Sequence, residues 1–252
     1  MRGEAQILDA SERSSIALIR EAVSAIDRIK DALLPAAIVP VAGWLTISLI
    51  AVLFETWVPE SIALSLAITP FYVIVAVVCH RLILLGDDSL PNRLGFFWSQ
   101  RETRFTGWFF MLGLLGAAMA LPIWFLVSAF PVEVFGGGQF GLSYYAAIIV
   151  GTYGEGRFIL VLPATAIGHH FTLGSSWKLT KGRGWRIAVA LLVPFLALQF
   201  IEYVVFSFPV LSTSRIAYYI WDVLTLPLVA VEVAIISVAY KWLADLEKGD
   251  DT

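Results

Sequence analysis

The sequence predicts an all-α membrane protein with six transmembrane helices, an N-terminal amphipathic helix and two short cytoplasmic interfacial helices. Composition is the first observation behind this fold class. Of the 252 residues, 59% are hydrophobic and only 15% are charged, whereas soluble domains carry roughly 25% charged residues. The second observation is that apolar residues form long continuous runs, which favours helices over the alternating pattern of barrel strands. The third is an uneven distribution of Lys and Arg between those runs. The mean hydropathy of +0.81 fits a lipid-facing surface, and the net charge of −3 gives no reason to expect nucleic acid as a partner.

Residues 1–33 predict an amphipathic cytoplasmic helix. Asp9 stands three residues before Glu12, which is the spacing of a capping box. Charged residues lie between the apolar side chains, which recur at spacings of three and four residues: Ile16, Ile19, Val23 and Ile26. This helix lies either along the membrane surface or against the bundle, and a partner-binding helix is the alternative.

Six apolar runs follow within a predicted transmembrane domain of residues 34–243, which precedes an acidic cytoplasmic tail at 244–252. Each run is long enough for a hydrocarbon core of about 30 Å, which needs roughly 20 helical residues. The expected spans are 34–54, 61–85, 107–130, 142–167, 187–208 and 216–242. An interior proline can kink a span and leave space inside a bundle, or simply shape its packing. Five spans carry one: Pro70, Pro122, Pro163, Pro194 and Pro227.

The Lys and Arg residues outside the spans fall almost entirely on one side. Fifteen lie in the N-terminal segment, in 81–104, in 168–186 and near the C-terminus, against one, Arg215, on the other side. By the positive-inside rule both termini and both basic segments are cytoplasmic. The predicted location is the inner (plasma) membrane.

The two basic segments resemble one another. Residues 94–108, the first elbow, and residues 173–185, the second elbow, both read Leu-Gly-x-x-Trp, then cations, then Gly-Trp before an apolar run. Leu and Trp four residues apart share a helix face, so each elbow predicts a short interfacial helix, with Ser89 and Thr172 as N-caps and Gly182 ending the second helix. Matching elbows predict a parallel repeat of two hairpins, and chance similarity is the alternative. The residues predicted to contact lipid headgroups are Arg101, Arg104, Trp177, Lys178, Lys181, Arg183, Trp185 and Arg186.

The second elbow also carries a family resemblance. The stretch ATAIGHHFTLGSSWKLTKGRGWRIAVALLV resembles the cytoplasmic segment of bacterial YciC-like membrane proteins and of the membrane domain that accompanies some glycerophosphoryl diester phosphodiesterases. In those proteins a Ser-x-x-Trp-x-Leu-Thr-x-Gly-like segment precedes a span that begins with Trp-Arg, as residues 176–186 roughly do here. The resemblance covers about residues 95–245 and implies an integral membrane protein. It implies no catalytic residue, because the soluble phosphodiesterase domain has no counterpart in this chain.

Charged residues inside the spans are functional hypotheses by default, because each costs at least about 2.5–3.5 kcal/mol on insertion scales. They are Glu155, Arg157, Glu202, Asp222 and Glu232. Arg157 and Glu232 share a depth near the membrane centre, which predicts an ion pair, and Glu202 and Asp222 share a shallower depth on adjacent spans. Two interpretations stay open: neutralising pairs that fix helix register, or a polar pathway that includes Glu155. The glycine-dense stretch 151–157 predicts close helix approach or a local break.

No catalytic motif is present, and we assign no catalytic residue, metal ligand or cofactor. His80, His169 and His170 are interpreted as interfacial polar residues, with a metal site as the alternative. The leading hypothesis is a non-enzymatic accessory or scaffolding protein that contacts membrane lipids or a membrane complex through its basic cytoplasmic face. The alternative is a small-solute or proton-coupled transporter that uses the charges at 155, 157 and 232, and a lipid-modifying enzyme comes third. A transporter needs a water-accessible cavity that reaches these charges, whereas a scaffold needs dry, packed helices.

Overall fold

A computed structural model describes residues 14–53, 62–90, 97–128, 142–212 and 214–250. Within these ranges the chain forms helices joined by short connections and contains no strand. Five helices are long and apolar enough to cross a membrane: Ser15–Ala51, Leu66–Leu85, Gln100–Leu126, Gly184–Phe206 and Tyr219–Glu247. The predicted all-α, multi-pass membrane class is confirmed at this level.

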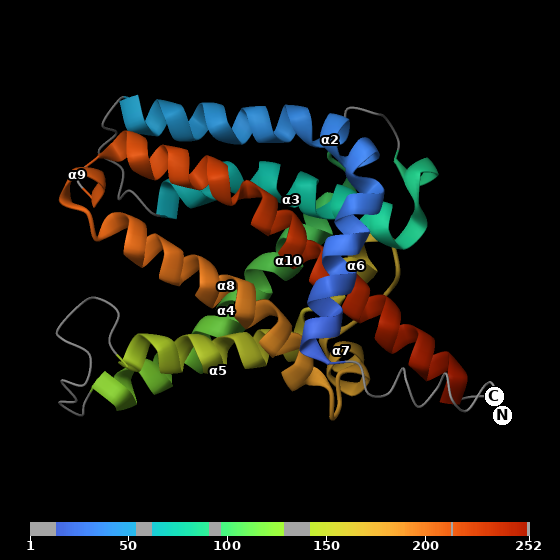
Figure 1. The fold of residues 1–252 in the computed structure, drawn as a ribbon. Coiled ribbons are helices and arrows are strands. Elements are labelled where there is room, and N and C mark those ends of the chain that lie inside the picture. Colours follow the sequence, from blue (N-terminus) through green and yellow to red (C-terminus); the bar gives the residue numbers. More distant parts are fainter. Residues whose placement is uncertain (1–13, 54–61, 91–96, 129–141, 213, 251–252) are drawn as a thin grey trace.

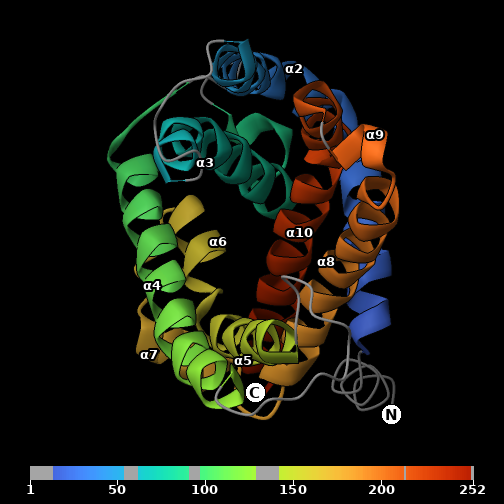
Figure 2. The same cartoon turned by 90° about the vertical axis from the view of Figure 1, so that its left-hand side faces the viewer.

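The long helices spread from one end of the molecule (Figure 1). They are α2 (Ser15–Leu53), α3 (Ile62–Leu85), α4 (Gln100–Ser128), α5 (Leu142–Phe158), α8 (Gly184–Phe206) and α10 (Arg215–Asp250). Short elements join them: η1 (Asp87–Ser89), α6 (Val161–Ala166), α7 (Leu173–Leu179) and α9 (Pro209–Ser212). Helices α6 and α7 and the N-terminal half of α2 lie at the end from which the long helices diverge. Seen along the bundle, α2 and α3, α4, α5, α8 and α10 surround a central space (Figure 2).

The run 142–167, predicted as one span, folds as two helices, α5 and α6, separated by a turn at residues 159–160. Pro163 explains where the helix breaks, because in a continuous helix its ring would clash with the carbonyl of Ile159, four residues earlier. In the first turn of a new helix a proline is tolerated, since its missing N–H would have no intrahelical partner there. The 17 residues of α5 span about 26 Å, slightly less than a hydrocarbon core of about 30 Å. The expectation of an unbroken span is therefore wrong for this run.

Helix α2 joins the predicted N-terminal helix to the first predicted span without interruption. It continues past residue 33, where the sequence suggested a boundary, and contains Pro35 and Pro40. The N-terminal half turns away from the rest of the helix (Figure 1), as expected where prolines remove backbone hydrogen bonds. It packs against the bundle, which was one of the two predicted placements.

The buried stripe of this N-terminal half differs from the predicted one. Its buried apolar residues are Leu18, Ala22, Ala25 and Ile29. By contrast, Ile16 is 69% exposed and Val23 is 51% exposed, so the predicted stripe is wrong at both positions. The observed stripe has the same spacing of three and four residues, and its two alanines let the helix approach the side chains of α8 and α10 closely.

The core consists of two clusters that meet at α6, whose six residues are all buried. Val161 and Leu162 pack with side chains of α2, α3 and α4. Ala164 packs with α8, α10 and the N-terminal half of α2. This short helix therefore fastens the end of the bundle from which the long helices diverge.

The described residues of the first elbow form no separate short helix: residues 97–99 are non-helical, and residues 100–108 belong to α4, which begins at Gln100. Ser99 starts α4 with a capping box: its N–H donates to Oε2 of Glu102 at 2.7 Å, and the two side chains also hydrogen-bond. Ser89, predicted as an N-cap, is instead the last residue of η1. Leu94 lies outside the described residues.

The second elbow forms the predicted helix, α7. Thr172 is its N-cap and accepts a hydrogen bond from the Ser175 N–H at 3.1 Å. Gly182, with φ of +74°, lies in the turn that links α7 to α8, where a left-handed backbone favours glycine. The two elbows therefore differ in local structure over their described residues.

Candidate functional site

A cavity of about 660 Å³ lies among the long helices. Its walls come from α3, α4, α5, α6, α8 and α10 and from the turn after α5. The volume falls within the range of roughly 300–1,000 Å³ that is typical of pockets for small organic ligands. The cavity coincides with the internal space that the five proline-containing spans suggested.

The walls are mainly apolar and rich in aromatic rings. The aromatic lining residues are Tyr72, Phe109, Phe110, Trp124, Tyr144 and Phe195. Tyr72 and Phe109 have ring centroids 5.2 Å apart, and Trp124 meets Tyr144 edge to face at 6.3 Å. These aromatic residues were not predicted from the sequence, because aromatic side chains recur throughout the apolar runs and nothing in their spacing separates cavity-wall positions from lipid-facing ones.

Two carboxylates line this cavity, Glu155 from α5 and Glu232 from α10. Both side chains are half-buried, and neither has a hydrogen-bond or ion-pair partner among the described residues. Tyr72 of α3 lines the same cavity. Two of the predicted intramembrane charges are thus brought together around one space.

Small residues shape the space beside Glu155. A side chain at Gly116 of α4 would overlap the Glu155 carboxylate, so this glycine leaves room for the acid. A Cβ added at Gly156 would lie 3.2 Å from the Ala188 backbone nitrogen of α8. The glycine-dense stretch therefore allows α5 to approach both α4 and α8, as its composition predicted.

Arg157 does not form the predicted ion pair with Glu232; both side chains are described, and no ion pair joins them. It is only 7% exposed and lies outside the cavity lining. Its guanidinium carbon sits 3.9 Å from the centre of the Trp177 ring, and one Nη donates to the Trp177 carbonyl at 2.9 Å. Gly184 makes room for the aliphatic part of the arginine. The guanidinium therefore contacts α7 instead of an acid, although its buried Nε has no hydrogen-bond partner among the described residues.

Helix α7 is fastened to the end of α5 by further contacts. The hydroxyls of Ser176 and Thr180 both donate to the Arg157 carbonyl, at 2.9 and 3.1 Å. The Phe158 ring stacks on Trp177 with centroids 5.3 Å apart. Arg157 and Phe158, which lie two and three residues after Glu155, therefore hold the second elbow in place.

The other two predicted intramembrane charges are Glu202 and Asp222. Glu202 is half-buried on α8 and is not among the residues that line the cavity. The side chain of Asp222 lies outside the described part of the structure. The Glu202–Asp222 arrangement therefore stays a prediction.

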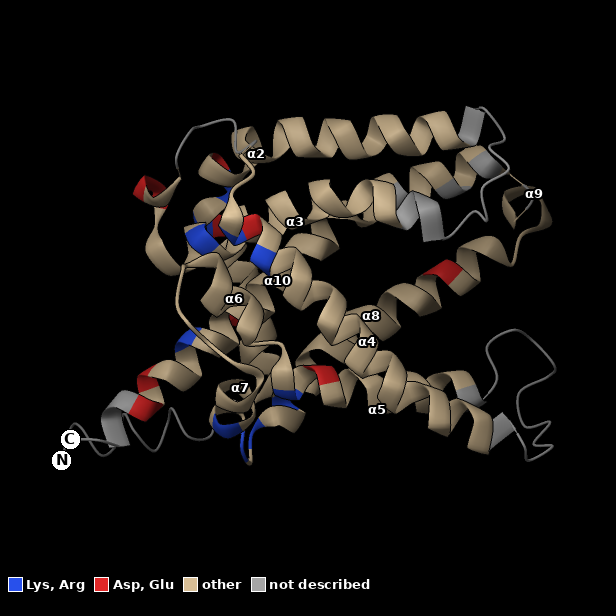
Figure 3. Ribbon diagram, turned by 180° about the vertical axis from the view of Figure 1, so that it is seen from behind, with Lys and Arg blue, Asp and Glu red and all other residues tan. Residues whose placement is uncertain are grey.

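The cations gather at the end of the molecule from which the long helices diverge (Figure 3). At the far ends of the long helices no described side chain is a Lys or Arg; Arg215 begins α10 there, and its side chain lies outside the described part of the structure. The predicted headgroup residues Arg104, Trp177, Lys178, Lys181 and Trp185 are exposed, whereas Arg183 and Arg186 are half-buried. Arg186 lies over the Trp185 ring at 5.6 Å.

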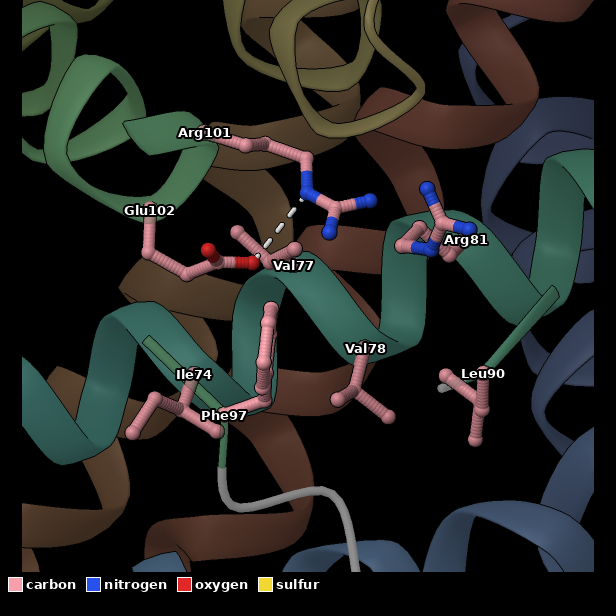
Figure 4. A pocket seen from close by; sticks show the side chains of 8 residues that line it. All are labelled: Ile74, Val77, Val78, Arg81, Leu90, Phe97, Arg101 and Glu102. Atoms are coloured by element: carbon pink, nitrogen blue, oxygen red, sulfur yellow. Dashed lines mark hydrogen bonds and ion pairs between the residues drawn. The ribbon is translucent and has the colours of Figure 1, made fainter. Parts of the chain in front are cut away.

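Arg101, the remaining predicted headgroup residue, pairs with Glu102 at 3.2 Å. It lines a small pocket of about 20 Å³ with Arg81 and apolar side chains (Figure 4). A volume of this size holds about one water molecule. Arg81 is held by the carbonyl groups of Ser89 and Ala166. These contacts join the end of α3 to η1 and α6, and the pocket is too small for an organic ligand.

The histidines do not form a metal centre. His80 is buried and its Nδ1 lies 2.7 Å from the Ser237 hydroxyl, while His169 Nδ1 lies 3.1 Å from the Tyr240 hydroxyl. The described residues contain no group of three or more His, Cys, Asp or Glu side chains that could hold a metal ion. His80 and His169 thus tie α3 and the segment before α7 to α10.

Comparisons of the chain with protein-family models, curated proteins and solved structures found no match. The resemblance of the second elbow to YciC-like proteins therefore stays an expectation.

Proposed function

We propose that this chain is a multi-pass membrane transporter that binds a small solute in the cavity beside Glu155 and Glu232. The observation that carries the proposal is a pair of carboxylates that line a cavity of about 660 Å³ and have no hydrogen-bond or ion-pair partner among the described residues. A carboxylate inside an apolar bundle is costly unless a cation or a proton neutralises it. A cationic solute or a proton that enters the cavity would supply the neutralising charge that the described protein residues do not.

The same observation argues against a purely scaffolding role, the leading hypothesis from the sequence. A scaffold needs packed helices, and acids that fix helix register need partners on neighbouring helices. Glu155 and Glu232 have no such partner among the described residues. Arg157, the third charge of the transporter hypothesis, contacts α7 and does not line the cavity. Its effect on transport would be indirect, through the position of the second elbow.

The basic end supports a second, compatible role in contacting membrane lipids. Trp177 and Trp185 are 47% and 53% exposed beside the exposed Lys178 and Lys181. Exposed tryptophan next to lysine suits the headgroup layer of a membrane. We place this end and both termini on the cytoplasmic side of a bacterial inner membrane, where a membrane complex can also be contacted. The test is protease digestion of a tag on either terminus. We expect the tag to be digested in inside-out vesicles and to be protected in right-side-out vesicles.

Access of water to the cavity tests the transport proposal. Cys79 is the single cysteine of the sequence and is buried, so an introduced cysteine reports on its own position. Thr152→Cys places a thiol in the cavity wall, and Val161→Cys is the matched control in the core. We expect a water-soluble thiol reagent to label Thr152→Cys about tenfold faster or more, because buried thiols react slowly. Equal protection of both thiols would overturn the proposal.

A further inference from the structure

The charge lining the cavity is of one sign. Among the described residues, its walls contain two carboxylates and no Lys, Arg or His. Arg157, the cation closest in sequence, is directed to the ring and carbonyl of Trp177. We infer that the ligand of this cavity is an organic cation with an apolar body, an inference that rests on the proposed function and specifies its substrate class.

The aromatic walls fit this ligand class. A cation within about 6 Å of an aromatic face is attracted by the ring, and the attraction is stronger where water is excluded. The cavity offers two aromatic groupings, one centred on Tyr72 and Phe109 and the other on Trp124 and Tyr144. Apolar substituents of a cation find matching wall between them, while Glu155 and Glu232 neutralise its charge.

Other occupants fit less well. An inorganic cation needs several oxygen ligands at close range, about six to eight for Ca²⁺, whereas this cavity is large and mainly apolar. A neutral acyl chain would match the walls but would leave Glu155 and Glu232 without a compensating charge. An anion would meet two acids and no cation. The organic cation is the class that satisfies both the walls and the charges.

Tetraphenylphosphonium and tetraphenylborate form a suitable probe pair, because they have nearly the same shape and opposite charge. We would measure their binding to the full chain in nanodiscs of zwitterionic lipid, with the signal of empty nanodiscs subtracted. The phosphonium should bind, and should protect Thr152→Cys from the thiol reagent; the borate should do neither. Equal binding of both ions would overturn the inference in favour of an apolar, lipid-like occupant.

The charge-neutral variants Glu155→Gln and Glu232→Gln test whether these two carboxylates bind the phosphonium. Each should weaken phosphonium binding about tenfold or more, since each removes one charge from an apolar site. Glu202→Gln, which changes a carboxylate that does not line the cavity, should leave binding unchanged. Unchanged binding in both cavity variants would overturn the inference. If a variant does not fold, the comparison of the two probe ions with the wild-type chain decides the question.

The thiol-labelling and binding results distinguish a failure of the organic-cation inference from a failure of the transport proposal. If Thr152→Cys is labelled but the phosphonium neither binds nor protects it, the cavity stands and the organic-cation class is wrong. If Thr152→Cys is as protected as Val161→Cys, the transport proposal itself fails.

Discussion

The contact between Arg157 and Trp177 gives the sharpest prediction about the fold. Replacing Arg157 with alanine should destabilise the protein, and the loss should be coupled to Trp177 and independent of Glu232. The reason is geometric: the guanidinium lies 3.9 Å from the Trp177 ring centre, whereas no ion pair joins Arg157 to Glu232. The ion pair predicted from the shared membrane depth of Arg157 and Glu232 would instead couple the loss to Glu232. The experiment therefore distinguishes the predicted ion pair from the observed contact with Trp177.

The expected magnitude follows from the contacts. Arg157→Ala removes a charged hydrogen bond worth about 1.5–3 kcal/mol and a buried cation–π contact worth roughly 1–2 kcal/mol. It also removes a buried Nε that has no partner, which recovers a desolvation cost of about 1–3 kcal/mol. We expect a net loss of about 2 kcal/mol in the free energy of unfolding. Trp177→Leu keeps the carbonyl that accepts the hydrogen bond, so its coupling to Arg157→Ala isolates the ring contact at about 1 kcal/mol.

The assay is reversible unfolding in mixed micelles titrated with dodecyl sulfate, followed by circular dichroism so that losing a tryptophan does not change the signal. The Arg157→Ala and Glu232→Gln changes should add within about 0.5 kcal/mol, as expected for residues that share no partner. Strong coupling of Arg157 to Glu232, together with additivity between Arg157 and Trp177, would refute the placement of the arginine under α7.

Two further predictions concern the first helix and the cavity. Leu18→Ala should cost about 2–5 kcal/mol in unfolding free energy, whereas Val23→Ala, on the exposed side of the same helix, should change it by no more than about 0.5 kcal/mol; the reverse order would restore the stripe predicted from the sequence. Phosphonium affinity should fall as the pH is lowered, because protonation removes the negative charge of Glu155 and Glu232 while the two tyrosines of the wall gain none. Equilibrium dialysis over a pH series measures this, and a pH-independent affinity would contradict the role of the acids.

The cavity also changes which functional hypothesis is preferred. Considered alone, the charges at 155, 157 and 232 favour neutralising pairs over a polar pathway. In the structure Glu155 and Glu232 line one space, whereas Arg157 supports an elbow. A pairing interpretation requires partners for the two acids that the described residues do not provide.

The sequence by itself determined the helical membrane class, because continuous apolar runs of roughly 20 residues satisfy both the hydrocarbon core and the backbone only as helices. It also determined local features that depend on neighbouring residues, such as the Thr172 cap of α7. Glu155 and Glu232 could be identified because a charge inside an apolar run stands out wherever its helix packs.

Only the tertiary structure decided the features that depend on which helices meet. The buried stripe of α2 follows Leu18 instead of Ile16, because adjacent apolar stripes have the same periodicity and packing against α8 and α10 selects between them. Arg157 turns to Trp177 because α7 folds back over the end of α5, which no count of membrane depth reveals. The cavity likewise lies between five long helices and α6. Its wall residues are distant in sequence, and each would suit lipid or packed core as well as a binding site.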